Sequence, residues 1–240
     1  MNKDLLINGI SALSGEITQA QISQFSAYSD LLVEWNEKMN LTAVTDPDGI
    51  SIKHFLDSIL PIYYIDFSKF NNIADIGTGA GFPGLPIKIM CPDISLTLID
   101  SLNKRINFLN TVIQNLELNG VDCIHGRAEE LGHKDELREH FDAVVSRAVA
   151  NMTVLCEYCL PFVKVGGYFI ALKSENAEEE LSAAKPMIGI LGGEVEQIID
   201  APLPMSDITR KLIVIRKAKE TEKKFPRRAD KIKKVNNKKS

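Results

Sequence analysis

The first 70 residues have apolar positions with the spacing of helices. Between residues 22 and 35, apolar side chains recur at steps of three and four, which places them on one helix face: Ile22, Phe25, Tyr28, Leu31, Leu32 and Trp35. The polar segment Trp35 to Thr42 follows, and a second helix is predicted from about Asp48 to Tyr64. Residues 1–70 are therefore predicted to form a helical N-terminal extension.

From Asn72 onward the pattern changes to alternating strands and helices. Strands are predicted near residues 72–77, 95–100, 121–125, 141–146, 167–173, 193–199 and 211–216. Helices are predicted near residues 84–91, 103–119, 153–161 and 175–191. This alternation is typical of an α/β fold with a mainly parallel sheet covered on both faces.

The last two predicted strands have no helix between them. Pro202 and Pro204 mark a loop there, which predicts an antiparallel pair at the edge of the sheet. This arrangement is typical of class I methyltransferases and not of dehydrogenases. Residues 71–217 are therefore predicted to form a Rossmann-like, class I methyltransferase domain with a seven-stranded, mostly parallel sheet.

Composition narrows the class of protein. With 240 residues and 45% apolar content, the chain is long enough for one large α/β domain and a smaller appendage. No apolar run approaches the roughly 20 residues of a membrane helix. The N-terminus also lacks the basic start and the apolar stretch of a signal peptide. The expectation is a cytoplasmic, monomeric enzyme with no membrane partner.

The four cysteines do not indicate a disulfide scaffold. Cys156 and Cys159 are the only close pair, and they lie in a predicted amphipathic helix that ends before Pro161. We interpret both thiols as small core residues, with a zinc or redox site as the alternative. No second Cys or His pair lies at metal-ligand spacing, so no metal is expected.

Charge is divided unevenly along the chain. Residues 210–240 contain 14 Lys and Arg against 3 Asp and Glu, whereas residues 1–209 contain 14 basic and 29 acidic residues. A basic terminal run of this size is typical of nucleic-acid binding. Residues 218–240 are predicted to be a tail that is disordered without RNA, with Arg227 and Arg228 as RNA contacts. A solvated tail that only aids solubility is the alternative.

A glycine-rich loop joins the first predicted strand of this domain to a helix. The loop contains four glycines, Gly77, Gly79, Gly81 and Gly84, whose backbone can turn tightly and approach a ligand closely. The following helix presents unpaired N–H groups. Gly79-x-Gly81-x-x-Gly84 also matches the dinucleotide fingerprint, with Asp100 as the acidic residue for ribose hydroxyls. The loop therefore predicts a nucleotide site and leaves its cofactor open.

Asp75 favours S-adenosylmethionine over a dinucleotide, because a carboxylate beside the loop repels a pyrophosphate and suits a sulfonium cation. Ligands of open α/β sheets bind at the carboxyl ends of the strands. The candidates there for the cofactor half are Gly77 to Phe82, Asp100, Ser101, Leu102, Ala128 and Glu129. Arg147 and Lys173 are the candidates for the substrate half, unless each pairs with a structural carboxylate.

Several motifs together resemble one family: Asn40-Leu41-Thr42, His54-x-x-Asp57-Ser58, Asp75 to Gly84, Asp100-Ser101-Leu102-x-Lys104-Arg105 and Ser146-Arg147-Ala148. The chain resembles, from about residue 20 to 217, the bacterial guanine-N7 methyltransferases of small-subunit ribosomal RNA, also called glucose-inhibited division protein B.

The resemblance implies that S-adenosylmethionine is the cofactor and that one guanine of 16S rRNA is methylated. It implies that the cofactor contacts Gly77, Phe82, Ala128, Glu129 and Arg147, with Asp100 on the ribose. The partner would be 16S rRNA or the small ribosomal subunit. Residues 229–240 depart from the tails of relatives, so no specific docking role is assigned to them.

Guanine N7 has an available lone pair, so attack on a sulfonium methyl needs no general base. We expect Arg147 and Lys173 to orient the guanine or its phosphates, while Lys104, Arg105 and the tail hold neighbouring RNA. Asn40, His54 and Asp57 either brace the N-terminal helices or line the cleft, and the spacing of the last two favours bracing. An oxidoreductase using NAD or FAD and a non-catalytic assembly factor are the alternative functions.

Overall fold

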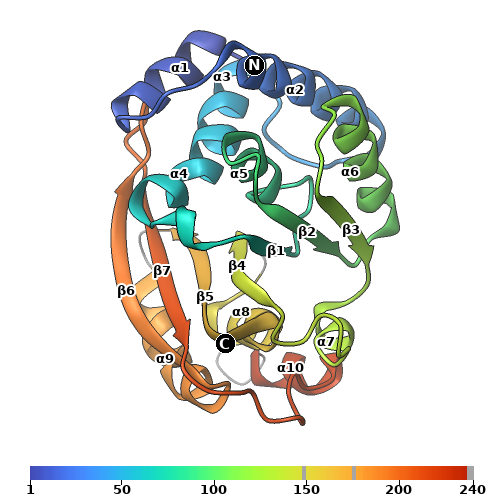
Figure 1. Ribbon diagram of the computed structural model, residues 1–240, viewed down its shortest axis with the longest axis vertical. Helices are drawn as coiled ribbons and strands as arrows, with labels where there is room; N and C mark the ends of the chain where they lie inside the picture. Colours follow the sequence, from blue (N-terminus) through green and yellow to red (C-terminus); the bar gives the residue numbers. More distant parts are fainter. Residues whose placement is uncertain (148–149, 175–176, 237–240) are drawn as a thin grey trace.

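Seven strands form one sheet in the order β3-β2-β1-β4-β5-β7-β6 (Figure 1). Their bounds are β1 Asn72–Ile76, β2 Ser95–Asp100, β3 Val121–His125, β4 Phe141–Arg147, β5 Val163–Ser174, β6 Gly193–Pro202 and β7 Thr209–Lys217. The first five strands pair in parallel, and β7 lies antiparallel between β5 and β6. This confirms the α/β fold with an antiparallel edge pair. The computed structural model describes residues 1–147, 150–174 and 177–236.

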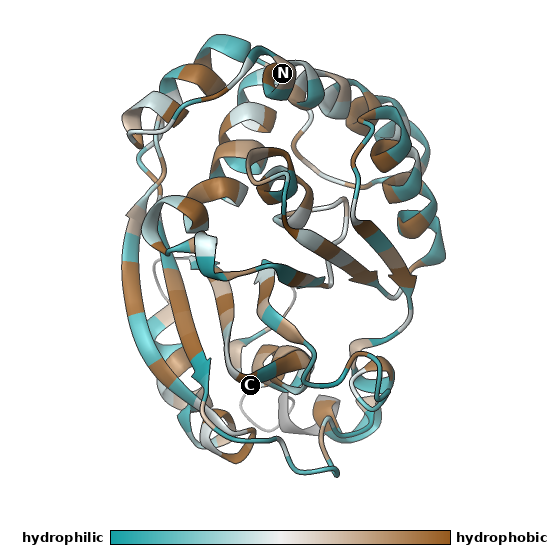
Figure 2. Cartoon of the chain, in the orientation of Figure 1, coloured by the Kyte–Doolittle hydropathy of each residue, from teal (hydrophilic) through white to brown (hydrophobic). Residues whose placement is uncertain are grey.

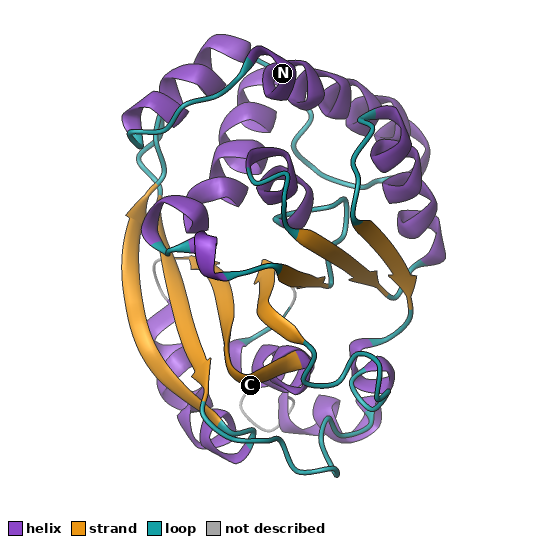
Figure 3. Cartoon of the chain, in the orientation of Figure 1, coloured by secondary structure: helices purple, strands orange, loops and turns teal. Residues whose placement is uncertain are grey.

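Helices cover both faces of the sheet (Figure 3). One face carries α1 Lys3–Ala12, α2 Gln19–Met39, α3 Pro47–Gly49, α4 Asp57–Tyr64, α5 Gly84–Met90 and α6 Asn103–Asn115. The other face carries α7 Ala128–Leu131, α8 Met152–Cys159, α9 Ala177–Ile190 and α10 Ala229–Asn236. Short 3₁₀ turns lie at Phe67–Lys69 and Leu160–Phe162, and a π-helical turn, Ile50–Leu56, joins α3 to α4. Residues 175–176, at the start of the helix predicted over 175–191, lie outside the described part.

Alternate residues of the central strands enter two separate cores. Ala143 and Val145 of β4 pack with the N-terminal helices, whereas Val144 packs with α8 and α9. Burial on both faces explains why apolar residues point to both sides of these strands, and Figure 2 shows hydrophobic segments along the sheet that are interrupted by polar ones.

The N-terminal helices belong to the same core as the sheet. Phe25, Tyr28 and Leu32 of α2 are fully buried beside Leu85 and Phe108. The helix begins with a capping box between Thr18 and Gln21 and ends at Asn40 in the left-handed conformation. The Tyr28 hydroxyl donates a hydrogen bond to the backbone oxygen of Ala80. The predicted extension therefore holds the glycine loop in place.

Cys156 and Cys159 are buried in α8, as their interpretation as core residues predicts. Burial raises the pKa of both thiols, so they stay protonated. Within the described residues, no group of His, Cys, Asp and Glu side chains is arranged to hold a metal ion. No helix in this part of the chain is long and apolar enough to cross a membrane.

The C-terminal segment differs from the predicted disordered tail. As far as it is described, residues 218–236 fold against the body of the protein, and Thr221, Phe225 and Ile232 are buried. Arg138 donates to the backbone oxygens of Thr221, at 2.7 Å, and Phe225, at 2.8 Å. Charge alone led to the disorder prediction, but these apolar and polar contacts compensate for the cost of ordering the segment.

Candidate active site

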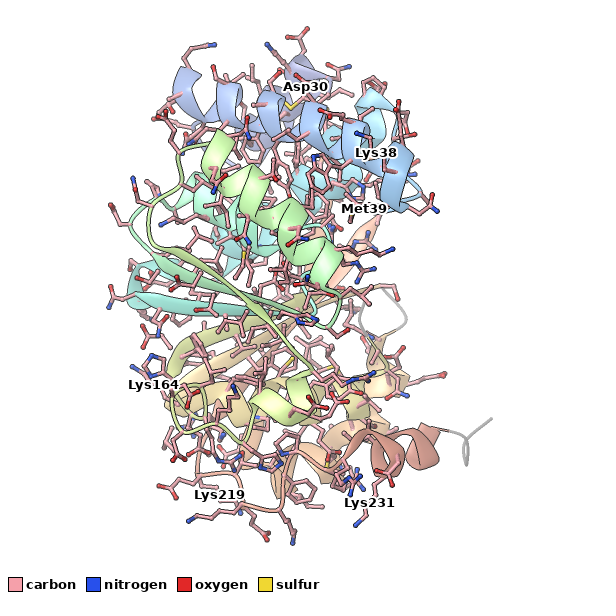
Figure 4. The ribbon with its side chains drawn as sticks, turned by 90° about the vertical axis from the view of Figure 1, so that its right-hand side faces the viewer. Asp30, Lys38, Met39, Lys164, Lys219 and Lys231 are labelled. Atoms are coloured by element: carbon pink, nitrogen blue, oxygen red, sulfur yellow. The ribbon has the colours of Figure 1, made fainter. Side chains whose placement is uncertain are left out.

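Three adjoining cavities form one groove at the carboxyl ends of the central strands. In Figure 4, Lys38 and Met39 at the end of α2 lie on the same side as Lys231 of α10, and Lys164 near the start of β5 lies on the opposite side. The groove opens on the side of α2 and α10, because the parallel strands point there.

The cavities share residues where they meet. The first is lined by Ile76, Gly77, Ile99, Asp100, Ser101, Gly126, Arg127, Ala128, Glu129 and Tyr158. The second is lined by Leu41, Thr42, His54, Gly77, Thr78, Gly79, Ala80, Phe82, Ser101, Arg105 and Arg147. The third is lined by Val44, Lys53, His54, Asp57, Arg147, Leu172, Lys173, Ser174 and Arg210. Gly77 and Ser101 join the first cavity to the second, and His54 and Arg147 join the second to the third.

The glycine loop owes its shape to positive backbone angles. Gly79 has φ +62° and Gly81 has φ +98°, a region that side chains other than glycine rarely adopt. A Cβ atom added at Gly81 would lie 2.5 Å from the Tyr28 hydroxyl, whereas one added at Gly79 would meet no atom within 4 Å. Gly81 is therefore needed for packing, and Gly79 leaves open space in the second cavity.

Asp100 fixes the opposite wall from the end of β2. Its carboxylate accepts the backbone N–H groups of Gly79 and Leu102, both at 2.9 Å, and the guanidinium of Arg105 at 3.2 Å. The carboxylate thus ties the glycine loop to the start of α6. Its side chain lines the first cavity, where sequence reasoning placed a ribose ligand.

Asp75 does not line the groove. Its side chain is fully buried beneath the glycine loop, where Oδ2 accepts the Gly84 N–H at 2.8 Å and the Thr78 hydroxyl at 2.7 Å. Burial raises the pKa of Asp75 to about 7, against the lowering effect of these hydrogen bonds. The prediction of direct cofactor contact is corrected, because the carboxylate shapes the loop from below.

An aromatic stack lies where the second cavity meets the third. Phe82 stacks on His54 with ring centroids 4.6 Å apart and on Tyr28 at 5.5 Å. The Arg147 guanidinium carbon lies 5.0 Å from the Phe82 centroid. His54 Nε2 lies 2.8 Å from the Thr42 hydroxyl. Burial, and after it the charge of Arg147, lowers the pKa of His54 to about 4, so the ring is neutral at physiological pH.

Asp57 accepts hydrogen bonds from two arginines that line the third cavity. Its Oδ2 accepts Arg147 Nη1 at 2.8 Å, and its Oδ1 accepts Arg210 Nε at 2.7 Å. Asp57 therefore lines the groove, and the favoured interpretation that it only braces a helix face is incomplete. Sequence reasoning did not select Arg210, since 153 positions separate it from Asp57. Its place in the basic C-terminal region was the only signal.

Both cations predicted for the substrate half are paired with carboxylates. Lys173 binds Glu180 at 2.7 Å and the backbone oxygen of Ala150 at 3.1 Å, while Arg147 binds Asp57. The alternative of carboxylate pairing therefore applies to both. Each still lines the third cavity, so pairing and substrate contact are compatible.

The remaining predicted residues lie in different surroundings. Ser101, Ala128 and Glu129 line the first cavity. Leu102 is exposed, and its backbone N–H donates to Asp100. Ala148 of the Ser146-Arg147-Ala148 motif lies outside the described residues.

The cations predicted to bind RNA also differ from one another. Lys104 and Arg228 are exposed, whereas Arg105 is tied to Asp100. Arg227 forms a close pair with the buried carboxylate of Glu157, with Nη2 and Oε2 2.6 Å apart. Arg105 and Arg227 therefore pair with buried carboxylates, whereas Lys104 and Arg228 are open to solvent, with Arg228 3.8 Å from the exposed Asp230.

The first two cavities fit S-adenosylmethionine. Asp100 offers a carboxylate for ribose hydroxyls, and the open space at Gly79 admits a ligand close to the backbone. Glu129 adds a second acidic side chain, and Ile76 and Ile99 add apolar contacts for a flat base. Acidic side chains suit a cationic sulfonium better than a pyrophosphate.

Sheet order, antiparallel edge pair and glycine loop together define a class I methyltransferase. The family model described as rRNA small subunit methyltransferase G matches residues 21–207. The chain belongs to this family of S-adenosylmethionine-dependent enzymes.

Individual relatives agree with this membership. The chain is 52% identical over 229 residues to the ribosomal RNA small subunit methyltransferase G of Alkaliphilus oremlandii, covering 95% of this chain and 96% of the relative. It is 47% identical to the enzyme of the same name in Bacillus subtilis, with 95% of each chain covered. A crystal structure of a predicted O-methyltransferase from Agrobacterium tumefaciens superposes with a TM-score of 0.50 at 18% identity, covering 70% of this chain and 81% of that one. The last similarity concerns the fold alone.

Proposed function

We propose that the protein transfers a methyl group from S-adenosylmethionine to N7 of one guanine in 16S rRNA. One observation carries this proposal: the first cavity, with acidic side chains suited to the cofactor, continues through the second into a third cavity lined by four cations and one carboxylate. The second and third cavities meet at His54 and Arg147, where the methyl group and the base would come together.

Methyl transfer to guanine N7 requires that the base and the methyl group be aligned, and it requires no general base. The cofactor supplies an electrophilic methyl group, and guanine N7 attacks through a lone pair that carries no proton. The Asp57 carboxylate is engaged by two arginines, and His54, with a pKa of about 4, is a weak base at neutral pH. Proximity and orientation supply about 7–11 kcal/mol in favourable cases. The residues at the junction therefore act by positioning.

Arg147 and Lys173 would orient the guanine through O6 or a phosphate. An arginine commonly binds both O6 and N7 of guanine, but N7 must stay free for attack here. Lys104, Arg105, Arg227 and Arg228 would hold neighbouring RNA. We also propose that the protein acts as a monomer in the cytoplasm and that 16S rRNA reaches it either naked or within a small subunit.

Methyl transfer from labelled S-adenosylmethionine tests the proposal. The acceptors are 16S rRNA and small subunits that lack their natural methylations, and N7-sensitive cleavage maps the product. Label at a single guanine N7 is expected. Cofactor binding without label on any of these acceptors would favour an assembly factor instead. Arg147→Ala should lower turnover or cofactor affinity, and full retention of both would contradict its role.

A further inference from the structure

We propose that Arg147 and Arg210, held side by side by Asp57, bind a backbone phosphate of the RNA strand that carries the target guanine. The proposal rests on the proposed function and deepens it. It adds Arg210, a residue of the last strand outside every motif named above, to the substrate site.

The geometry of the pair is fixed by one buried carboxylate. Arg210 donates to Asp57 through Nε at 2.7 Å and Nη2 at 3.2 Å, and Arg147 donates through Nη1 at 2.8 Å. The Asp57 side chain is 1% exposed, while those of Arg147 and Arg210 are 13% and 25% exposed. The arginines therefore cover the carboxylate and remain open to the cavity.

Charge in the third cavity is unbalanced. One carboxylate neutralises one arginine, so the cluster of three side chains keeps a net positive charge. Lys53 lines the same cavity, and Lys173 is already paired with Glu180. A half-buried excess cation is costly unless an anion completes the site. We therefore expect the cavity, of about 430 Å³, to bind an anionic ligand.

The free donor geometry suits a phosphate. Guanidinium groups present N–H donors in a planar fork that matches phosphate oxygens. Within the described part of the chain, Arg210 Nη1 has no hydrogen-bond partner, whereas Nε and Nη2 are taken by Asp57. Asp57 thus orients Arg210 and leaves one of its donor groups for a ligand.

Position links this phosphate to the reacting base. Arg147 and His54 line both the second and the third cavity, so an anion bound in the third lies next to the end of the cofactor groove. Arg210 lines only the third. If the anion were the cofactor's own carboxylate in the second cavity, it would contact Arg147 and not Arg210. A substitution of Arg210 therefore distinguishes an RNA phosphate from the cofactor carboxylate.

Arg210→Ala tests the proposal, with Arg216→Ala as its matched control. Arg216 lies on the same strand, away from the groove, and pairs with Glu194 at 2.9 Å, so both variants lose one cation from β7. RNA affinity is measured at several salt concentrations, and cofactor binding is measured by calorimetry with S-adenosylhomocysteine. Thermal melting with and without S-adenosylhomocysteine checks the fold.

Arg210→Ala is expected to weaken RNA binding about 10-fold, the loss of one charged contact. Its slope of log affinity against log salt should fall by about 0.7, the value of one phosphate contact on a single strand. Its affinity for S-adenosylhomocysteine should stay unchanged. In Arg216→Ala, the RNA affinity, the salt slope and the affinity for S-adenosylhomocysteine should all stay unchanged. Arg210→Lys keeps the charge but loses the planar guanidinium, so it should keep the slope while binding RNA less tightly.

Equal RNA affinity and equal slope in Arg210→Ala and the wild type would overturn the proposal and leave Asp57 with a purely structural arginine pair. A loss of S-adenosylhomocysteine affinity in Arg210→Ala would assign the anion to the cofactor. Failure of the proposed function looks different: the wild type would transfer no methyl group, while the comparison of binding slopes would still test the phosphate site.

Discussion

The two ends of the groove are built in different ways. The cofactor end is built around one continuous loop, Gly77 to Gly84, which is held by the carboxylate of Asp100 on the neighbouring strand. The substrate end consists of side chains from remote parts of the chain, since Asp57, Arg147 and Arg210 come from α4, β4 and β7.

This difference assigns different tasks to backbone and side chains. At the cofactor end, glycines remove Cβ atoms so that a ligand can lie against the backbone. At the substrate end, a carboxylate orients arginine guanidinium groups, which supply hydrogen-bond donors to the substrate. Substitutions at the two ends should therefore separate cofactor binding from RNA binding.

The largest effect is expected where one group supports a whole end of the groove. Asp57→Ala leaves Arg147 and Arg210 without their carboxylate, and removing one partner of a buried ion pair costs about 3–5 kcal/mol. Urea unfolding should show this loss, and methyl transfer should fall with it. Glu194→Ala is the control, because Glu194 is 63% exposed in its pair with Arg216 and should cost less than about 1 kcal/mol. Similar stabilities for the two variants would contradict the central role of Asp57.

The same difference explains what the sequence could predict. The glycine spacing, Asp100 and the strand pattern are local features, so the fold and the cofactor end follow from neighbouring residues. Asp57 and Arg210 lie 153 positions apart and meet only through the sheet. Asp75 was misplaced because its position beside the loop is visible in sequence, but the side of the loop it faces is not. The C-terminal segment was predicted to be disordered because its many charged residues dominate the sequence pattern. The few apolar residues that anchor it, such as Phe225 and Ile232, do not stand out in that pattern.

The two ends should also respond oppositely to pH. Burial raises the pKa of Asp75 to about 7 from 3.8, so its contribution to stability is present below about pH 4 and is lost as pH rises through 7. Burial and Arg147 lower the pKa of His54 to about 4 from 6.5, so stability is present above about pH 6.5 and is lost as pH falls through 4. In the wild type these trends oppose each other.

Asp75→Asn removes the first trend and keeps the size of the side chain. The free energy of unfolding of the variant should therefore rise more steeply with pH between 4 and 7 than that of the wild type. The difference between the two proteins should change by about 4 kcal/mol over this range, because each pH unit between the unfolded and folded pKa values contributes about 1.36 kcal/mol. Urea unfolding at four pH values measures it, and parallel curves would show that Asp75 is not protonated in the fold.

Asp100→Asn should act mainly on the cofactor end. The amide keeps the size of the side chain but loses the charge that suits ribose hydroxyls and Arg105, so affinity for S-adenosylhomocysteine should fall about 10-fold to 100-fold. Asp142→Asn is a matched control, since Asp142 also accepts two backbone N–H groups, from Asn71 and Asn72, away from the groove. Equal cofactor affinity in the two variants would remove Asp100 from the site.

The smallest effect concerns one Cβ atom and isolates the role of the glycine backbone. Gly79 and Gly166 both have positive φ angles, +62° and +87°, and an added Cβ would meet no atom within 4 Å at either. Gly79→Ala and Gly166→Ala should therefore lose similar stability, about 1 kcal/mol each, through backbone strain. Only Gly79 lines the groove, so only Gly79→Ala should also weaken S-adenosylhomocysteine binding. Calorimetry on both variants measures this, and equal affinities would mean that the ligand does not approach the backbone at Gly79.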